Sequence, residues 1–373
     1  MKKIVIAHGH SSIEILHSLT PLILSAYKKI EWKWKFLDYK ISNLFNQEGD
    51  LLILVRKYHN INILPEDISK DFVKLKKNFS KIIYFDDSAS PSMIDFDILS
   101  HVDSYWKRAL FKNQNLYYQK MYGGRLFSDY YHKNFKVIDN KIYFNKIANN
   151  QTNFNKIKIA WNIGIGAYPL NNNKIFTNFY PTTRRVVSAL STISAFKLIY
   201  KFIKLSFYDV QENLVKSVDL KKKLLRISSR FTADSYSRSV GFQRQLALEK
   251  VENIDFFLNG TINKKEFINE TYSVFGILST FGWGEICYRD FEANLGGAYL
   301  IKPDMSHVDT WPNIYKEDMY FKLNWNLSSL DKIDFLFDNI NECENAINTS
   351  RNEYLNCIKS TVPRCIKMIN EVI

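Results

Sequence analysis

Cysteine is scarce in this chain and shows no metal-site pattern. The four cysteines among 373 residues form no CxxC pair and no Cys/His ligand spacing: Cys287, Cys343, Cys357 and Cys365. Reduced, incidental thiols are therefore the favoured interpretation, ahead of a metal site. A paired DxD carboxylate motif after a suitable strand is also missing, so we expect no bound metal ion.

Long hydrophobic runs are missing as well. Ile4–Ala7 is too short for the apolar region of a signal peptide, although Met1-Lys2-Lys3 is basic. The longest apolar region, Val186–Phe207, is interrupted by Lys197, Lys201 and Lys204, which disfavours a transmembrane span. We expect a cytoplasmic protein.

The same lysines leave two interpretations open for a predicted basic helix over Arg184–Leu205. They share one stripe of the helix, and Ile193, Phe196, Ile199, Phe202 and Ile203 lie elsewhere on it. Core packing with a solvated stripe is the default for such a pattern. The alternative is docking on an anionic membrane surface, as a peripheral protein on the inner face of the cell membrane.

Acidic residues are too few to balance the basic ones, and the imbalance is uneven. Residues 1–180 carry 26 Lys and Arg against 15 Asp and Glu, residues 181–250 carry 14 against 5, and residues 251–373 carry 11 against 18. This asymmetry favours an anionic partner, such as a phosphate-bearing substrate or a membrane surface. The lack of a zinc-finger or RRM signature argues against nucleic acid.

The chain has enough residues and apolar side chains for two α/β domains. In the first half, apolar strands predicted at 2–7, 31–38, 50–58 and 81–85 alternate with helices predicted at 12–28 and 65–77. This alternation predicts a doubly wound parallel sheet. A further strand is predicted at 156–165, after an irregular aromatic-rich stretch at 113–150, and the polar segment 171–183 is the expected hinge.

A second α/β unit is predicted after the hinge. Its strands are expected at 224–229, 254–258, 274–279 and 298–301, its helices at 237–250, 264–270 and 288–295, and two or three helices at 330–373. The fold class is therefore two Rossmann-like domains. We expect residues 1–175 to form the first and residues 176–350 the second.

The most informative segment reads FGWGEICYRDFEANLGGAYLIKPD, from Phe281 to Asp304. An apolar strand ends there, Gly282 and Gly284 allow close approach of a ligand to the backbone, and a helix then begins with free N–H groups. Such a helix terminus suits the phosphates of a nucleotide. Glu292 on this helix offers two acceptor oxygens for the adjacent hydroxyls of a ribose.

This segment resembles the C-terminal signature of the group 1 glycosyltransferases, which have the GT-B fold. The resemblance covers residues 225–315 and places the ribose-binding glutamate at Glu292, the glycine turn at Gly282 and Gly284, and the helix-ending glycines at Gly296 and Gly297. The family pattern has a second glutamate eight positions earlier. Here that position is Gly284, and the nearby acid, Glu285, is seven positions before Glu292.

The resemblance implies a metal-independent transferase that takes a sugar from a nucleotide-sugar substrate, with no cofactor. The stretch around Arg289 and the continuation LIKPDMSHVDTWPNIY are similar to a subset from bacterial polysaccharide and lipopolysaccharide gene clusters, which implies a glycan or lipid-linked acceptor. The family resemblance also implies that the two domains face a cleft and that the last helix, residues 351–373, packs back on the first domain.

Related enzymes bind the donor diphosphate with a basic pair after the first strand of the second domain. Arg230, Arg238 and Arg244 are the candidates here, and the predicted helix at 237–250 offers its N-terminus as well. Arg289 is a further candidate, with a surface pair to Asp290 or Glu285 as its alternative. Fixed positive charge would stabilise the departing nucleoside diphosphate.

The first domain is expected to supply the acceptor pocket and a general base. Polar side chains lie at the ends of three of its predicted strands: His8 and His10, Arg56, and Asp86-Asp87. Ligands of open α/β sheets bind at the carboxyl ends of strands, so all three positions qualify. A His or an Asp can act as the base, and we take His10, Asp87 and His8 as the candidates.

The sequence is also compatible with two other functions. One is another enzyme on the same scaffold, such as a sugar-nucleotide epimerase or a transferase that uses a CMP-activated sugar. The second is a non-catalytic basic protein that binds a membrane or nucleic acid.

Overall fold

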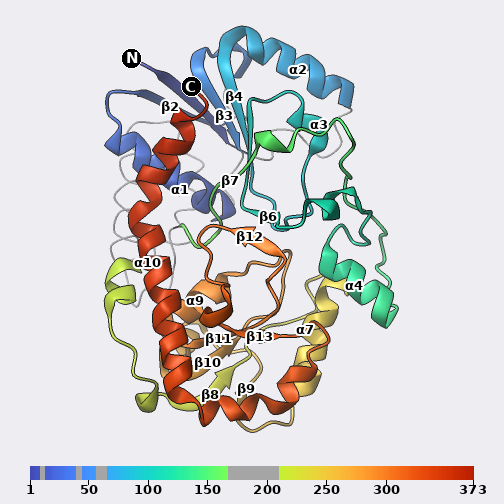
Figure 1. Ribbon diagram of the computed structural model, residues 1–373, viewed down its shortest axis with the longest axis vertical. Helices are drawn as coiled ribbons and strands as arrows, with labels where there is room; N and C mark the ends of the chain where they lie inside the picture. Colours follow the sequence, from blue (N-terminus) through green and yellow to red (C-terminus); the bar gives the residue numbers. More distant parts are fainter. Residues whose placement is uncertain (9–12, 39–43, 56–64, 167–209) are drawn as a thin grey trace.

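The computed structural model describes residues 1–8, 13–38, 44–55, 65–166 and 210–373. Two α/β domains lie one above the other along the long axis of the molecule, and the first half of the chain forms the upper domain (Figure 1). The expected boundary at 175/176, the hinge at 171–183 and the basic helix at 184–205 lie outside the described residues.

The upper domain contains a parallel sheet of six strands in the order β2-β1-β3-β4-β5-β7. Its central strand β3 is buried from Leu51 to Val55, as expected for a parallel strand covered on both faces. The helices α1 (Ile13–Lys28) and α2 (Pro65–Asn78) connect the first strands. The strands are β1 (Lys3–His8), β2 (Lys33–Asp38), β3 (Gly49–Val55), β4 (Phe79–Asp86), β5 (Ser104–Lys107) and β7 (Ile157–Ile159).

The lower domain has its own parallel sheet, in the order β13-β11-β10-β8-β9. Local signals set the helix limits. Asn263 and Glu266 form a capping box at the start of α8, and Gly297, whose φ of 64° suits glycine, caps the end of α9. The strands are β8 (Leu224–Ser228), β9 (Phe257–Leu258), β10 (Val274–Leu278), β11 (Tyr299–Pro303) and β13 (Phe321–Leu323), and the helices are α7 (Arg238–Val251), α8 (Lys264–Ser273) and α9 (Tyr288–Gly296).

Two structures join the domains on one flank. A two-stranded antiparallel ribbon pairs β6 (Ala109–Phe111) of the upper domain with β12 (Val308–Thr310) of the lower one. Residues 112–150, called the arm from here on, contain the 3-10 helix Gln114–Tyr118 and α4 (Leu126–Phe135), which packs against α7. The arm runs down the right side of Figure 1 past the junction of the domains.

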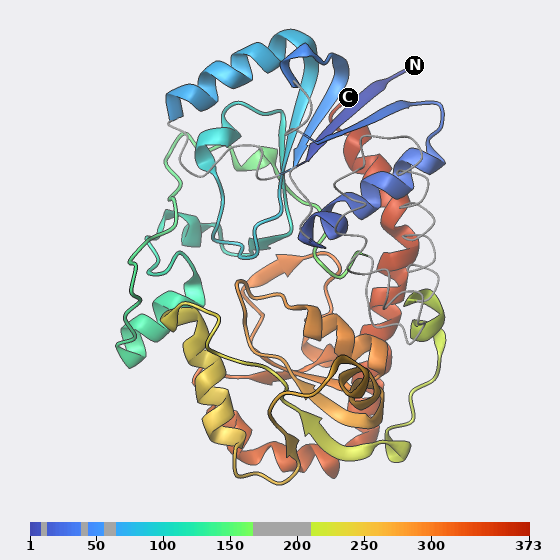
Figure 2. The same cartoon turned by 180° about the vertical axis from the view of Figure 1, so that it is seen from behind.

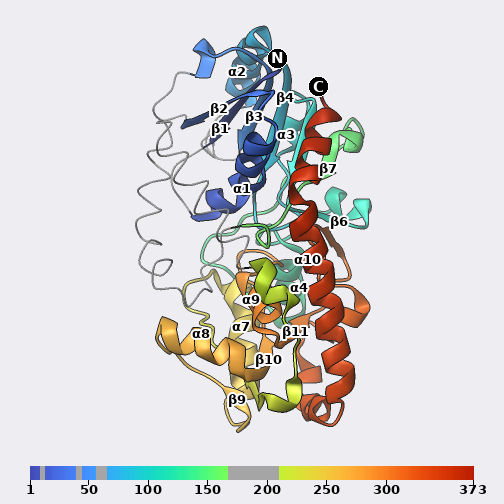
Figure 3. The ribbon, with the colours of Figure 1, turned by 90° about the vertical axis from the view of Figure 1, so that its left-hand side faces the viewer.

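On the other flank a single long helix, α10 (Ile340–Asn370), spans both domains (Figure 3). Cys343 and Ile347 pack in the core of the lower domain, while the Tyr354 hydroxyl donates to the Gly164 carbonyl at 2.6 Å and the helix end packs on α1. The predicted two or three terminal helices are therefore a 3-10 segment (Ser328–Phe337) and one helix that crosses back. None of the described helices is both long enough and apolar enough to cross a membrane.

The fold class expected from the sequence is confirmed: two Rossmann-like domains and a C-terminal helix that returns to the first. Most predicted strands and helices are also found, within a few residues at their ends. The strand β5 is a difference, because the sequence predicts no element at 104–107. Its four residues are all buried, but they include Ser104 and the fully buried Lys107, so no apolar run marks the strand.

Candidate functional site

A cleft of about 890 Å³ lies between the two domains, at the carboxyl ends of the strands of both sheets. The residues after β4, β8, β9 and β10 all reach its wall, as the rule for open α/β sheets predicts. Basic side chains dominate its charged lining: Arg108, Arg125, Arg230, Arg244, Lys264 and Arg289, against Asp87 and Glu292. This excess of cations suits an anionic ligand.

The two glycines of the predicted turn line the cleft but differ in what surrounds them. A Cβ added at Gly282 would meet Arg244 Nη2 and Cys287 Sγ at 3.4 Å, an ordinary contact distance. A Cβ at Gly284 would lie 2.1 Å from the carbonyl oxygen of Ala89 in the upper domain. Gly284 therefore permits close contact between the domains, and Gly282 leaves room beside a basic side chain.

The N-terminal turn of α9 brings a cation and a carboxylate to the cleft. Arg289 and Glu292 are three residues apart, so they share one face of the helix. The Arg289 Nη2 donates to the Arg230 carbonyl at 2.5 Å, while its buried Nη1 has no hydrogen-bond partner among the described residues. Burial lowers the pKa of Arg289 and raises the pKa of Glu292, and the attraction between the two charges opposes both shifts.

Asp290, between them, is a structural residue. It is fully buried, forms an ion pair with the equally buried Lys302 at 3.0 Å, and accepts from the Tyr315 hydroxyl at 2.7 Å and the Cys287 N–H at 2.9 Å. Burial and the Asp290 charge hold the pKa of Tyr315 well above its usual value. Lys302, rather than Arg289, is thus the partner of Asp290, and Arg289 faces the cleft.

Glu285 lies outside the cleft lining. It is fully buried, accepts from the Ser90 hydroxyl of the upper domain at 3.2 Å, and approaches His307 Nε2 at 4.0 Å. Its position and contacts connect the two domains. A donor contact by Glu285 would require a rearrangement of this junction.

The three arginines predicted to bind phosphate occupy different positions. Arg230 lines the cleft, but Glu270 pairs with it at 2.8 Å. Arg244 also lines the cleft; it donates to the carbonyls of Phe281 at 2.8 Å and Thr232 at 3.1 Å, with its guanidinium 4.4 Å from the Tyr236 ring centroid. Arg238 is exposed and outside the lining.

The N-terminus of α7, also expected to bind phosphate, is already occupied. Asp139 of the arm accepts from the Ser239 N–H at 2.7 Å and from the Ser239 hydroxyl at 2.6 Å. A carboxylate at this helix end satisfies the free N–H groups and the positive end of the helix dipole. Two other helix N-termini of the lower domain reach the cleft, that of α8, which begins at Lys264 and is closed by the capping box of Asn263 and Glu266, and that of α9.

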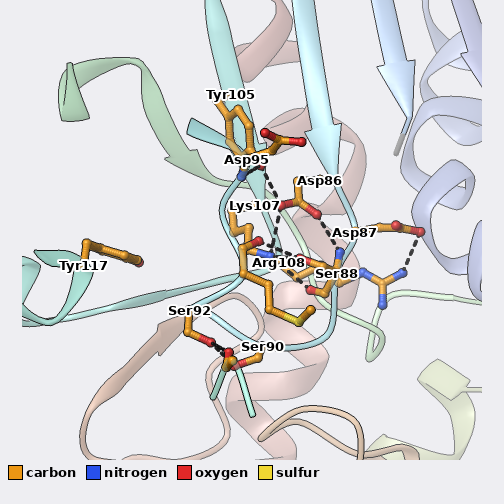
Figure 4. Close-up of polar contacts among 12 residues, drawn as sticks. Asp86, Asp87, Ser88, Ser90, Ser92, Asp95, Tyr105, Lys107, Arg108 and Tyr117 are labelled. Atoms are coloured by element: carbon orange, nitrogen blue, oxygen red, sulfur yellow. Dashed lines mark hydrogen bonds and ion pairs between the residues drawn. The ribbon is translucent and has the colours of Figure 1, made fainter. Parts of the chain in front are cut away.

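Two acid–base pairs lie side by side at the ends of β4 and β5 (Figure 4). Asp86 and Lys107 are both buried and pair at 3.3 Å, and Asp86 also accepts from the Tyr105 hydroxyl at 2.6 Å. Asp87 pairs with Arg108 at 3.4 Å. Asp86 thus anchors the loop after β4, and Asp87 lines the cleft.

Of the two histidine candidates, His8 lies in the described part of the chain, and it does not line the cleft with Asp87. His8 is buried at the end of β1 and is not part of the cleft lining. His10 and Arg56 lie outside the described residues. Within the described part of the chain, Asp87 is therefore the candidate base that reaches the cleft.

Sequence reasoning missed two arginines of the upper wall, Arg108 and Arg125. The Arg125 Nε donates across the cleft to the Trp283 carbonyl at 2.7 Å, and its Nη1 donates to the Gly123 carbonyl at 2.9 Å. Arg108 follows β5, a strand that the sequence does not predict, and Arg125 lies in the stretch 113–150, which the sequence predicts to be irregular. Their basic charge is visible in the sequence, but their position depends on the tertiary fold.

The described residues contain no cluster of three or more His, Cys, Asp or Glu side chains that could hold a metal ion.

No protein-family model and no curated protein matches the chain. Among solved structures it is similar to Anabaena Alr3699/HepE in complex with UDP, with 6% identity over 99% of this chain and 100% of the other and a TM-score of 0.47. It is also similar to a glycosyltransferase from Rickettsia africae, with 9% identity over 99% of this chain and 98% of the other and a TM-score of 0.44. A third similar structure is an alpha-glucosyltransferase in complex with UDP, with 7% identity over 96% of this chain and 95% of the other and a TM-score of 0.39.

Proposed function

We propose that the protein is a glycosyltransferase that moves a sugar from a nucleotide-sugar donor to an acceptor in the interdomain cleft. One observation carries the proposal: α9 presents its N-terminus, Arg289 and Glu292 to a cleft with six basic and two acidic side chains. A nucleoside diphosphate offers both groups that this arrangement suits, two phosphates for the cations and a ribose diol for the carboxylate.

The lower domain holds the donor in this proposal. Arg244, Lys264 and Arg289 face the diphosphate, and Glu292 accepts hydrogen bonds from the ribose hydroxyls. Arg230 has a weaker role, because Glu270 already neutralises it. As the bond to the sugar breaks, negative charge grows on the leaving diphosphate, and cations held in place stabilise that charge without a metal ion.

The upper domain holds the acceptor. Asp87 is the one carboxylate of the cleft lining on this side, and its pair with Arg108 orients it. We assign Asp87 as the base that takes the proton of the attacking hydroxyl. Asp87→Asn is expected to lower kcat with donor affinity preserved, whereas a loss of donor affinity would remove Asp87 from this role.

The acceptor that we propose is a glycan or lipid-linked carbohydrate of a bacterial surface polysaccharide, either lipopolysaccharide, O-antigen or capsule. The enzyme would then work in the cytoplasm, with peripheral contact to the inner face of the cell membrane. This part rests on the sequence motif around Arg289 and on the basic charge of the upper domain. EDTA is expected to leave the activity unchanged.

The test is incubation with a panel of UDP-, GDP-, TDP- and CMP-sugars, with released nucleotide as the readout and calorimetry for binding. Glu292→Gln is expected to weaken donor binding by about tenfold or more, since a hydrogen-bonding carboxylate to the ribose is lost. The matched control is Glu252→Gln, at an exposed glutamate outside the cleft lining. Unchanged binding by the Glu292 variant would overturn the donor site.

The alternatives give different results in the same assay. A sugar-nucleotide epimerase would alter the donor sugar without consuming an acceptor, and a CMP-sugar transferase would respond to CMP-sugars alone. A protein that binds nucleic acid without catalysis would ignore all donors and bind DNA in a salt-dependent way.

A further inference from the structure

The surface of the arm is basic and carries no exposed carboxylate. Its only acidic residues are Asp129 and Asp139, both buried; Asp129 pairs with Lys133 at 2.5 Å and Asp139 bonds to Ser239. All six arm lysines are exposed: Lys112, Lys120, Lys133, Lys136, Lys141 and Lys146. Of these, Lys146 is neutralised by Asp95 and Asp97 outside the arm.

The same surface is unusually apolar. Fourteen large hydrophobic side chains are exposed among the described residues, and six of them belong to the arm. The most exposed are two isoleucines on either side of a bend, at 57% and 58%, and the full set is Tyr118, Phe135, Ile138, Ile142, Phe144 and Ile147. Such a concentration marks an interaction surface, because single exposed apolar residues are normally scattered.

The exposure does not come from a loosely held segment. The Asp139 N–H donates to the Tyr122 hydroxyl at 2.5 Å, and Tyr122 and Phe144 form an antiparallel bridge. The Tyr143 hydroxyl accepts from Arg125, a residue of the cleft wall. The apolar side chains are therefore held outward on a framework that is directly connected to the cleft.

The composition of this surface selects its partner. A two-fold symmetric dimer through this surface would bring one basic face against another, and the like charges would repel. Single-stranded nucleic acid is bound by aromatic faces and arginine, whereas the two most exposed apolar side chains here, Ile138 and Ile142, are aliphatic. Aliphatic side chains surrounded by lysines are typical of a protein surface that lies in the headgroup region of an anionic bilayer.

We propose that the outer edge of the arm docks on an anionic membrane. Ile138, Ile142 and Phe144 enter the boundary between headgroups and acyl chains, and Lys120, Lys136 and Lys141 contact lipid phosphates. The Lys120 ammonium already lies 4.2 Å from the centroid of the Phe144 ring, so a cation and an aromatic anchor act at one point. The link to a lipid-linked acceptor rests on the proposed function, but the docking itself needs no transfer activity.

The experiment is sedimentation of the full chain with vesicles of phosphatidylcholine alone or with about 30% phosphatidylglycerol, a content that gives a negative surface potential. Binding is expected only with the anionic lipid, and it should weaken as salt rises. Lys120→Ala/Lys141→Ala should weaken binding about 25-fold, since each lysine contributes about fivefold at such a surface. Ile142→Ser/Phe144→Ser should weaken it at least tenfold, because two buried anchors are lost.

Matched control variants come from α2, at the top of Figure 2 and away from the arm at its left edge. Val73→Ser removes a side chain that is 55% exposed, and Lys76→Ala/Lys77→Ala removes two exposed lysines; both should bind vesicles like the wild type. Equal losses in the α2 and arm variants would overturn the proposal. So would arm variants that bind vesicles normally, or that change only the oligomeric state in light scattering.

Nucleotide-sugar binding is measured on the same variants to separate the two proposals. Arm variants should bind donor like the wild type, because none of the four substituted side chains lines the cleft. If no donor binds to any form but vesicle binding still depends on the arm, the proposed function fails and the docking surface stands. If donor binds and the arm variants keep full vesicle binding, the docking surface fails and the donor site of the proposed function stands.

Discussion

Asp139 and Ser239, 100 positions apart in the chain, form a two-point contact: the carboxylate accepts from the Ser239 N–H at 2.7 Å and from its hydroxyl at 2.6 Å. This contact connects the arm of the upper domain to the first turn of α7 in the lower domain. It also fills a helix terminus that would otherwise attract phosphate. The donor site is therefore expected at α9 rather than at α7.

The first prediction concerns this contact. Asp139→Ala leaves a buried N–H and a hydroxyl without their acceptor, so the free energy of unfolding is expected to fall by about 2 kcal/mol. Urea unfolding followed by circular dichroism measures the change. Asp334→Ala, at an exposed aspartate of the 3-10 segment Ser328–Phe337, should change the free energy by less than about 0.5 kcal/mol. Similar losses in both variants would contradict the role of Asp139.

Two arginines near the start of α7 give a matched pair for ligand binding. Arg244→Gln removes a cation from the cleft wall and is expected to weaken nucleoside-diphosphate binding about tenfold, because a charge-assisted contact is lost. Arg238→Gln removes an exposed cation outside the lining and should leave the affinity within about twofold. Calorimetry with UDP and GDP distinguishes them. Equal effects would place the phosphates elsewhere.

The two glycines of the turn are expected to respond differently to alanine. Gly284→Ala places a methyl group 2.1 Å from the Ala89 carbonyl oxygen, so the domains must separate or the loop must shift, at a cost of about 1–3 kcal/mol. Gly282→Ala meets nothing closer than 3.4 Å and should keep the stability of the wild type.

Thermal unfolding and small-angle scattering check this pair. The Gly284 variant should show a lower Tm and a larger radius of gyration, whereas the Gly282 variant should show neither. A normal Tm and radius for Gly284→Ala would mean that the close contact with Ala89 is easily relieved.

His17 on α1 predicts a pH dependence of stability. Burial, with a smaller contribution from the charge of Arg108, lowers the pKa of His17 from 6.5 to about 3. Between these values the unfolded chain binds a proton that the folded protein does not, so the free energy of unfolding falls as pH decreases below 6.5. At pH 5 the loss relative to pH 7 is expected to be about 2 kcal/mol.

Urea unfolding at pH 7 and pH 5 tests this expectation. His17→Gln removes the titrating group. Between the two pH values, the free energy of unfolding of the variant should therefore fall by about 2 kcal/mol less than that of the wild type. A parallel pH dependence in the variant and the wild type would mean that His17 is accessible to protons in the folded state.

Several elements followed from local sequence patterns alone. Apolar runs placed β1, β3 and β4, and the glycine turn before Tyr288 correctly predicted the start of α9. Such signals are readable because burial on both faces demands continuous apolar residues and helix ends demand particular backbone conformations. The strand β5 could not be predicted from its own residues, because it buries the charged Lys107. That charge is stabilised by an ion pair with Asp86, on another strand of the sheet.

Part of the candidate site was likewise predictable from the sequence, and part was not. The sequence by itself determined the alternating α/β pattern, the basic character of the chain and the loop-helix segment that presents Arg289 and Glu292, since all of these depend on neighbouring residues. Only the tertiary structure decided that Arg125 and Arg108 join the cleft, that Arg238 and Glu285 lie outside it, and that Asp139 caps α7. These positions depend on how the two domains pack against each other, and the residues near each position in the sequence do not determine that packing.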